Sequence, residues 1–166
     1  MIQMMYNTPA IALAKLMELG LPPIFEQIWQ SHGPRRFCCQ WNHPRRFFDM
    51  DLQADLELFC PRISQCVPLL ECDLDELVAY DSVANEYVSL VYEGATCKVI
   101  GANYQQFLSS LFVDLGYAGL QDVVEDVAPL FGYKYLVEFR RFMETDDDDE
   151  LSCEEVKARF VRSIPV

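Results

Sequence analysis

The chain has 166 residues and a formal net charge of −13, because 26 aspartates and glutamates outnumber 13 lysines and arginines. Hydrophobic residues make up 51% of the sequence, which is typical of a folded protein and excludes global disorder. The negative charge argues against binding to nucleic acid or to an anionic membrane, since both need clustered cations, and it favours a basic partner.

The N-terminal segment predicts two helices. Residues 10–18 are mostly strong helix formers, with a cap at Asn7 or Thr8 and a stop at Gly20. Apolar residues at helical spacing predict a second helix after Pro23, which ends near Gly33.

A basic and aromatic stretch follows at residues 35–48. Such a stretch can bind single-stranded nucleic acid by stacking, but the charge of the whole chain opposes that role. We expect its arginines to pair with carboxylates of the acidic body and its aromatic residues to enter the core. The residues concerned are Arg35, Arg36, Phe37, Trp41, Arg45, Arg46, Phe47 and Phe48.

The middle of the chain predicts an antiparallel meander, a sheet of consecutive strands joined by short turns. Strand-forming residues occur over 66–71, 76–81, 87–92 and 97–100, with polar connections between them. Connections this short join antiparallel neighbours, because a parallel pair needs a long crossover.

Helices are predicted after the meander. An apolar stripe from Tyr104 to Leu115 has helical spacing, and a further helix is predicted over 120–131. The aromatic spacing of 133–143 fits either a helix or a strand. These patterns predict an α+β fold, an antiparallel meander sheet packed by amphipathic helices.

The acidic run 146–150 predicts an exposed boundary, since adjacent carboxylates repel one another. Ser152 and Glu155 then have the spacing of a capping box, which predicts the start of a last helix. We therefore divide the chain into one domain, residues 1–145, and an appended C-terminal helical extension, residues 146–166.

One cluster has the side chains of a metal site, in the order His32, Cys38, Cys39 and His43. Zinc favours four cysteine or histidine ligands, but adjacent cysteines rarely reach one ion and the usual ligand spacing is absent. A metal-binding module or metal-dependent enzyme is thus the alternative hypothesis. The leading expectation is that the chain binds no metal and no cofactor.

The seven cysteines are an odd number and accompany no recognisable export signal, so we expect reduced thiols in a cytoplasmic protein. Cys60, Cys66 and Cys72 recur every six residues, and core packing is the expected role for them.

No apolar stretch approaches about 18 residues, so no membrane span is predicted. Nucleophile elbows and phosphate-binding loops are also missing, so we expect no catalysis.

Five short elements occur in an order that resembles the SUKH superfamily, whose fold is shared by many bacterial immunity proteins and a yeast cell-wall regulator. The resemblance covers roughly Ala10 to Leu115 and implies helices packed on an antiparallel sheet. It also implies a binding role without catalytic residues, because bacterial members neutralise toxins that are often nucleases or deaminases. The elements are Leu21-Pro22-Pro23-Ile24-Phe25, Val67-Pro68-Leu69-Leu70-Glu71, Ala79-Tyr80-Asp81, Tyr87 to Glu93, and Tyr104-x2-Phe107-Leu108.

The leading hypothesis is a cytoplasmic immunity protein that neutralises a cognate bacterial toxin by direct binding through an acidic surface. A nuclease must present a basic surface to phosphates, and an acidic inhibitor can occupy it. Residues 47–133 carry two cations and fifteen anions, so a basic partner should meet this segment. A non-catalytic regulatory adaptor is a further alternative. The candidate contact residues are Asp73, Asp75, Glu76, Asp81, Glu86 and Glu93.

Overall fold

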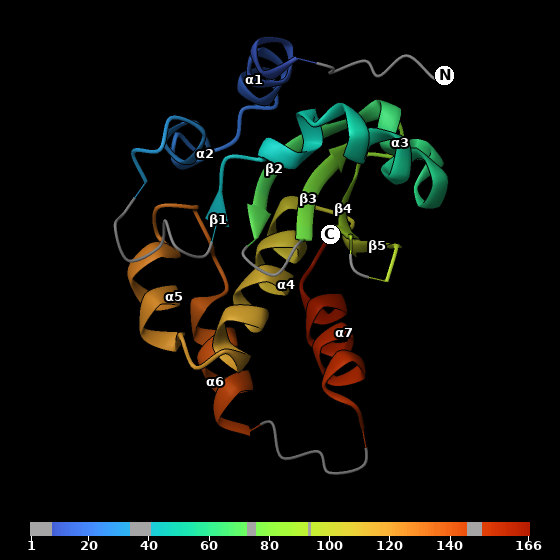
Figure 1. The fold of residues 1–166 in the computed structure, drawn as a ribbon. Coiled ribbons are helices and arrows are strands. Elements are labelled where there is room, and N and C mark those ends of the chain that lie inside the picture. Colours follow the sequence, from blue (N-terminus) through green and yellow to red (C-terminus); the bar gives the residue numbers. More distant parts are fainter. Residues whose placement is uncertain (1–7, 34–40, 73–75, 93, 146–150) are drawn as a thin grey trace. The chain divides into compact units, whose positions relative to one another are not determined.

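The computed structural model describes residues 8–33, 41–72, 76–92, 94–145 and 151–166 (Figure 1). The chain divides into two compact units, Met1–Val99 and Ile100–Val166. Within the described residues there are seven α-helices and one five-stranded sheet, whose strands follow one another in chain order. The α+β fold with a meander sheet and a C-terminal helix is therefore confirmed. The division at residue 145 stays a prediction.

The first unit contains strands β1 to β4 and most of β5. The predicted strands agree with the observed ones to within a residue or so at each end. The structure adds a short strand and three helical segments between residues 41 and 65, where no element is predicted. In order the elements are α1 (Pro9–Glu18), α2 (Ile24–Trp29), β1 (Trp41–Asn42), the 3-10 helix η1 (Arg45–Phe48), α3 (Met50–Phe59), the 3-10 helix η2 (Pro61–Gln65), β2 (Cys66–Cys72), β3 (Glu76–Asp81), β4 (Glu86–Val91) and β5 (Thr96–Gly101).

The first helix begins and ends where the sequence predicts. Thr8 is the N-cap of α1, and its hydroxyl accepts a hydrogen bond of 3.3 Å from the backbone N–H of Ile11. Gly20 follows the helix with φ of +66°, a left-handed conformation that glycine adopts at little cost. Both α1 and α2 contact β2.

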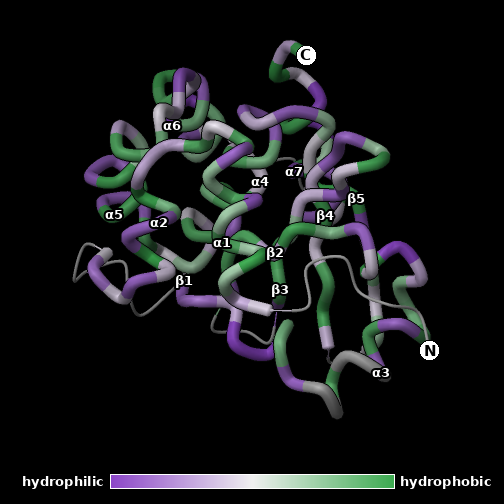
Figure 2. Tube along the Cα trace, turned by 90° about the horizontal axis from the view of Figure 1, so that it is seen from above, coloured by the Kyte–Doolittle hydropathy of each residue, from purple (hydrophilic) through white to green (hydrophobic). Residues whose placement is uncertain are grey.

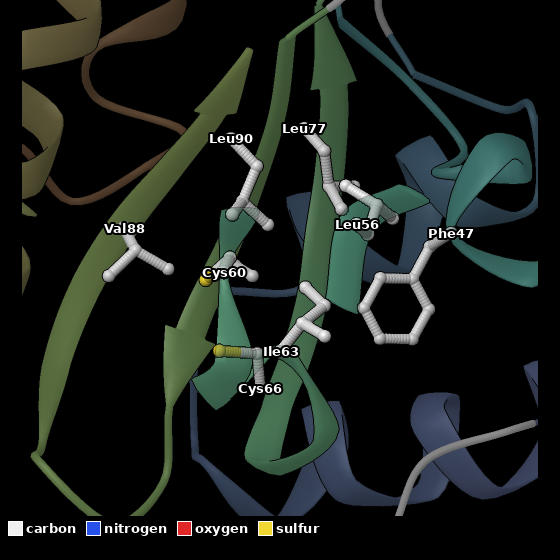
Figure 3. Packing of buried hydrophobic residues seen from close by; sticks show 9 residues of the cluster. Phe47, Leu56, Cys60, Ile63, Cys66, Leu77, Val88 and Leu90 are labelled. Atoms are coloured by element: carbon white, nitrogen blue, oxygen red, sulfur yellow. The ribbon is translucent and has the colours of Figure 1, made fainter. Parts of the chain in front are cut away.

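One face of the sheet carries the core of the first unit (Figure 3). Leu77 pairs with Leu90 and Ala79 with Val88 across β3 and β4, so these four side chains share a face. Side chains from η1, α3 and η2 pack against them. The buried cluster consists of Phe47, Leu56, Cys60, Ile63, Cys66, Leu77, Ala79, Val88 and Leu90.

Pro68 lies inside β2, where it cannot donate a hydrogen bond to a neighbouring strand. The register with β3 shifts between Pro68 and Leu70, which indicates a β-bulge at Leu69. The buried indole Nε1 of Trp29 donates a hydrogen bond of 2.8 Å to the carbonyl oxygen of Leu69. This bond attaches α2 to the strand at the irregularity and satisfies a carbonyl inside the protein.

Trp29→Phe tests that attachment. The substitution keeps an aromatic ring but removes the indole donor, so it should lower the free energy of unfolding by about 1–3 kcal/mol. Urea unfolding of the purified protein measures the loss. His32→Phe, which replaces one aromatic ring by another at an exposed position, is the control. A loss no larger than that of the control would show that the bond to Leu69 contributes nothing.

The second unit is helical. Its elements are α4 (Tyr104–Tyr117), α5 (Gln121–Val127), α6 (Leu136–Thr145) and α7 (Cys153–Ser163), and α4 contacts each of the other three. Residues 136–145 form α6, which decides the ambiguous 133–143 segment in favour of a helix. Both α6 and α7 contain hydrophobic and hydrophilic residues, as Figure 2 shows. Phe139 is buried on α6, and Val156, Phe160 and Val161 are buried on α7.

Polar contacts attach α7 to α4. The Nζ of Lys157, a largely buried side chain, lies 2.6 Å from the Asp114 carboxylate. The Gln106 side chain donates a 2.8 Å hydrogen bond to the carbonyl of Ile164. The predicted capping box is present, because Ser152 and Glu155 bond each other's backbone N–H groups. The last helix therefore packs on α4 within the second unit.

Candidate functional site

The sequence-predicted carboxylates occupy more than one part of the sheet. Glu76 begins β3 and Asp81 ends it, and a strand of this length spans about 17 Å. Glu86 begins β4 and pairs with Asp81. The structure therefore brings Asp81 and Glu86 together and places Glu76 at the other end of the strand. Asp73, Asp75 and Glu93 lie outside the described residues.

Glu76 is half-buried and makes a contact along the sheet. The hydroxyl of Ser89 donates a hydrogen bond to its Oε1, and Ser89 itself is buried. Since Ser89 pairs with Val78, the bond joins β3 to β4 on the sheet face opposite the core cluster.

Asp81 is completely buried, at 0% exposure. Side chains alternate along a strand, so Asp81 lies on the same face as Leu77 and Ala79, which belong to the core cluster. The Gln65 amide nitrogen lies 3.0 and 3.2 Å from the two carboxylate oxygens, and an Arg62 guanidinium nitrogen lies 3.5 Å from one of them. These partners are internal, so Asp81 shapes the turn beside it.

The surroundings of Asp81 favour its charged form. Burial alone would raise the pKa of this carboxyl. The backbone N–H groups of Ala84 and Val83, the Gln65 amide and the Arg62 charge together outweigh burial and hold the pKa below its ordinary value. Asp81 is therefore ionised at neutral pH.

Glu86 shares Arg62 with Asp81. Its Oε1 lies 3.2 Å from Nη1 of Arg62, and both side chains are partly exposed. Arg62 thus bridges the end of β3 to the start of β4 from η2. Exposed pairs of this kind contribute little free energy, but this one fixes the direction of the Glu86 carboxylate.

The 81–86 turn, which joins β3 to β4, is held by hydrogen bonds at several positions. Oδ1 of Asp81 accepts bonds of 3.0 Å from the N–H groups of Val83 and Ala84. The Ser82 hydroxyl donates a 2.8 Å bond to the Gln65 carbonyl.

Asn85 completes the turn with φ of +58°, a conformation that asparagine tolerates better than most residues. The Tyr80 hydroxyl donates a 3.0 Å bond to its side-chain oxygen. Val83 is left 66% exposed. The turn is a preorganised loop that presents an apolar side chain next to carboxylates.

The expectation for the basic and aromatic stretch is confirmed for Trp41, Arg46 and Phe47. Trp41 and Phe47 are buried. Arg46 pairs with Glu71 at 3.3 Å and lies over the Tyr92 ring at 5.7 Å. Arg35, Arg36 and Phe37 fall outside the described residues.

A polar pocket of about 330 Å³ adjoins this stretch, at the end of α2 and along β1. His43 and Arg45 line it together with Glu71, so it holds groups of both signs. Burial, and then the Arg45 charge, lowers the pKa of His43, which leaves the imidazole neutral at neutral pH. The remaining lining residues are Ile28, Ser31, Trp41 and Asn42.

The proposed metal ligands are described only in part. His32 is exposed, whereas His43 packs edge-on against Trp29, with ring centroids 4.8 Å apart. Cys38 and Cys39 lie outside the described residues. Among the side chains that are described, no group of three or more histidines, cysteines and carboxylates is arranged to hold a metal ion.

Cys60 and Cys66 are buried in the core cluster, in agreement with the expected packing role, and Cys72 is partly buried. In the described part of the chain, no helix is both long enough and apolar enough to cross a membrane.

Comparison with known proteins gives no match, either to a family model, to a curated protein or to a solved structure.

Proposed function

We propose that this chain is a cytoplasmic immunity protein, which neutralises a basic bacterial toxin domain by binding it through carboxylates of the meander sheet. The preorganised 81–86 turn is the observation that carries the proposal. A loop already fixed in one conformation loses little entropy when it binds, so more of its contact energy becomes affinity.

The chemistry of the turn suits a basic protein partner. Val83 offers an exposed apolar contact, and Glu86 offers a partly exposed carboxylate beside it. An apolar centre with a charged rim is the usual anatomy of a protein interface. The acidic segment 47–133 supplies a wider negative field that would steer a basic partner toward the sheet.

The resemblance to the SUKH superfamily supports the same proposal, because the α+β class with a meander is the fold which that resemblance implies. A regulatory adaptor with this fold would bind a protein other than a toxin. Co-expression with a toxin, where one is encoded beside this chain, separates the two roles. Immunity predicts that cells survive, and equal killing with and without this chain would overturn it for that pair.

Neutralising the proposed contacts should slow binding. Two variants test the proposed contacts. One combines Val83→Ser with Glu86→Gln in the 81–86 turn, and the other combines Asp73→Asn with Asp75→Asn and Glu93→Gln, three candidates outside the described residues. Each should lower the association rate with the purified toxin domain about tenfold at low salt and flatten its salt dependence. Stopped-flow fluorescence measures both quantities.

The matched control for those variants is Glu138→Gln with Glu144→Gln, which removes two exposed carboxylates from α6. Its association rate should equal that of the wild type. Equal slowing by the control would mean that only net charge matters, and no slowing by either test variant would place the interface elsewhere.

The metal hypothesis has its own readout. A structural zinc site should copurify with about one equivalent of metal, and His43→Ala should lose it. Elemental analysis that finds less than about a tenth of an equivalent in the wild type would remove this alternative.

A further inference from the structure

Two cysteines far apart in the sequence meet at the edge of the core cluster. The sulfur atoms of Cys60, at the start of η2, and Cys97, on β5, lie 2.9 Å apart. Both belong to the first unit, and both are free thiols. A disulfide needs a sulfur separation of about 2.05 Å, so bond formation requires a movement of less than about 1 Å.

The two thiols differ in access. Cys60 is buried, at 1% exposure, and Figure 3 shows its sulfur within the cluster. Cys97 is partly exposed and packs against that cluster. An oxidant from solvent can therefore reach Cys97 first, and Cys60 is in position to react second.

The surroundings of Cys60 also favour oxidation of Cys97 before Cys60. Burial, and then the contact with Cys97, raises the pKa of Cys60, so this thiol stays protonated. Arg62, which follows Cys60 by two positions in η2, lies beside both thiols. The third nearby thiol, Cys66, is fully buried and donates a 3.3 Å bond to the Arg62 carbonyl.

We propose that Cys60 and Cys97 form a peroxide-sensitive oxidation site that closes to an intramolecular disulfide. In the first step the Cys97 sulfur attacks one oxygen of a hydroperoxide and breaks the O–O bond. The thiol proton passes to the departing oxygen, which gives a sulfenic acid on Cys97 and an alcohol, or water when the oxidant is hydrogen peroxide.

In the second step the Cys60 sulfur attacks the Cys97 sulfur and displaces hydroxide, which takes the Cys60 proton and leaves as water. Two thiols are thereby oxidised by two electrons, and the hydroperoxide is the species reduced. The product joins the α3–η2 junction to β5 through a covalent bond.

The test treats the reduced full-length protein with a small excess of hydrogen peroxide and then blocks the remaining thiols with N-ethylmaleimide in guanidinium, which exposes the buried ones. Before the blocking step, intact mass should fall by about 2 Da, the mass of two hydrogen atoms. Trypsin cleaves after Arg46, Arg62 and Lys98, so a non-reducing digest should join peptide 47–62 to peptide 63–98. Fragmentation of the joined pair should place the bond at Cys97, with Cys66 and Cys72 labelled by maleimide.

Two variants and one solvent condition complete the experiment. Cys97→Ser should abolish the joined peptides, and Cys153→Ser, which alters an exposed thiol on α7, should leave them unchanged. Peroxide treatment in guanidinium should produce several different disulfide pairings, because only the folded structure brings Cys60 next to Cys97. A native protein that keeps Cys60 reduced while Cys97 is oxidised, or that joins Cys60 to Cys66, would overturn the proposal.

Discussion

Replacing Asp81 with asparagine should lower the free energy of unfolding by about 3 kcal/mol at neutral pH, because it removes one partner of a buried charged network. Asp81 has no exposure to solvent and binds Gln65, Arg62 and two backbone N–H groups of the 81–86 turn. Asparagine keeps the shape but offers one acceptor oxygen in place of two and carries no charge to balance Arg62.

The effect should depend on pH in a defined direction. Folding lowers the pKa of Asp81, so its charge stabilises the protein above the unfolded-state pKa, and this stabilisation is lost as pH falls through the folded-state pKa. Asparagine does not titrate. The difference in the free energy of unfolding between the variant and the wild type should therefore be fully present at neutral pH and become smaller below about pH 4.

Urea unfolding at neutral and at acidic pH measures both effects. Asp55→Asn, which alters an exposed carboxylate on α3, is the matched control and should change stability by less than about 0.5 kcal/mol. A loss that is equal for Asp55→Asn and Asp81→Asn, or that stays constant with pH, would contradict the role assigned to the buried carboxylate.

Gly101→Ala should destabilise the protein by about 3 kcal/mol or prevent folding, because the added methyl group meets rigid backbone. A Cβ atom at Gly101 would lie 2.4 Å from the backbone nitrogen of Phe107 and 2.7 Å from its Cα. Both contacts are far below van der Waals distance, and the backbone of α4 cannot rotate away as a side chain can.

Gly116→Ala is the matched comparison within α4. Its added methyl group would meet the flexible end of Met143 at 2.9 Å, and the ring of Phe139 at 3.3 Å. Alanine also favours a helix over glycine by about 1 kcal/mol, which offsets the crowding. Thermal unfolding should show a small change for Gly116→Ala and a large one for Gly101→Ala. Similar changes in both would mean that the α4 backbone yields to the new methyl group.

Most of the fold could be predicted from local patterns. The strands from β2 to β5 and the helix α4 lie where alternation and helical spacing placed them. Residues 41–65 could not be assigned, since their short helical segments depend on packing against the sheet and carry little periodicity of their own. Residues 133–143 stayed ambiguous because aromatic residues suit both helices and strands.

The candidate site was harder to predict because burial is a tertiary property. In the sequence, Asp81 and Glu86 are both acidic residues at strand ends. In the structure, Asp81 is fully buried and Glu86 is partly exposed. A signal for Asp81 did exist, since it continues the alternation of Leu77 and Ala79, whose side chains face the core. No pattern could have predicted the meeting of Cys60 and Cys97, which are 37 positions apart.

The boundary between the two units falls within β5, between Val99 and Ile100. The two units are each compact, but the chain cannot be cut between them without interrupting a strand. A fragment that stops at the boundary would lose the end of an edge strand, and one that starts there would begin with Ile100, which is buried, and with Gly101, which is pressed against Phe107. Neither unit can be excised or transplanted cleanly at that point, so recombination between related proteins should exchange β5 whole and keep Gly101 with α4.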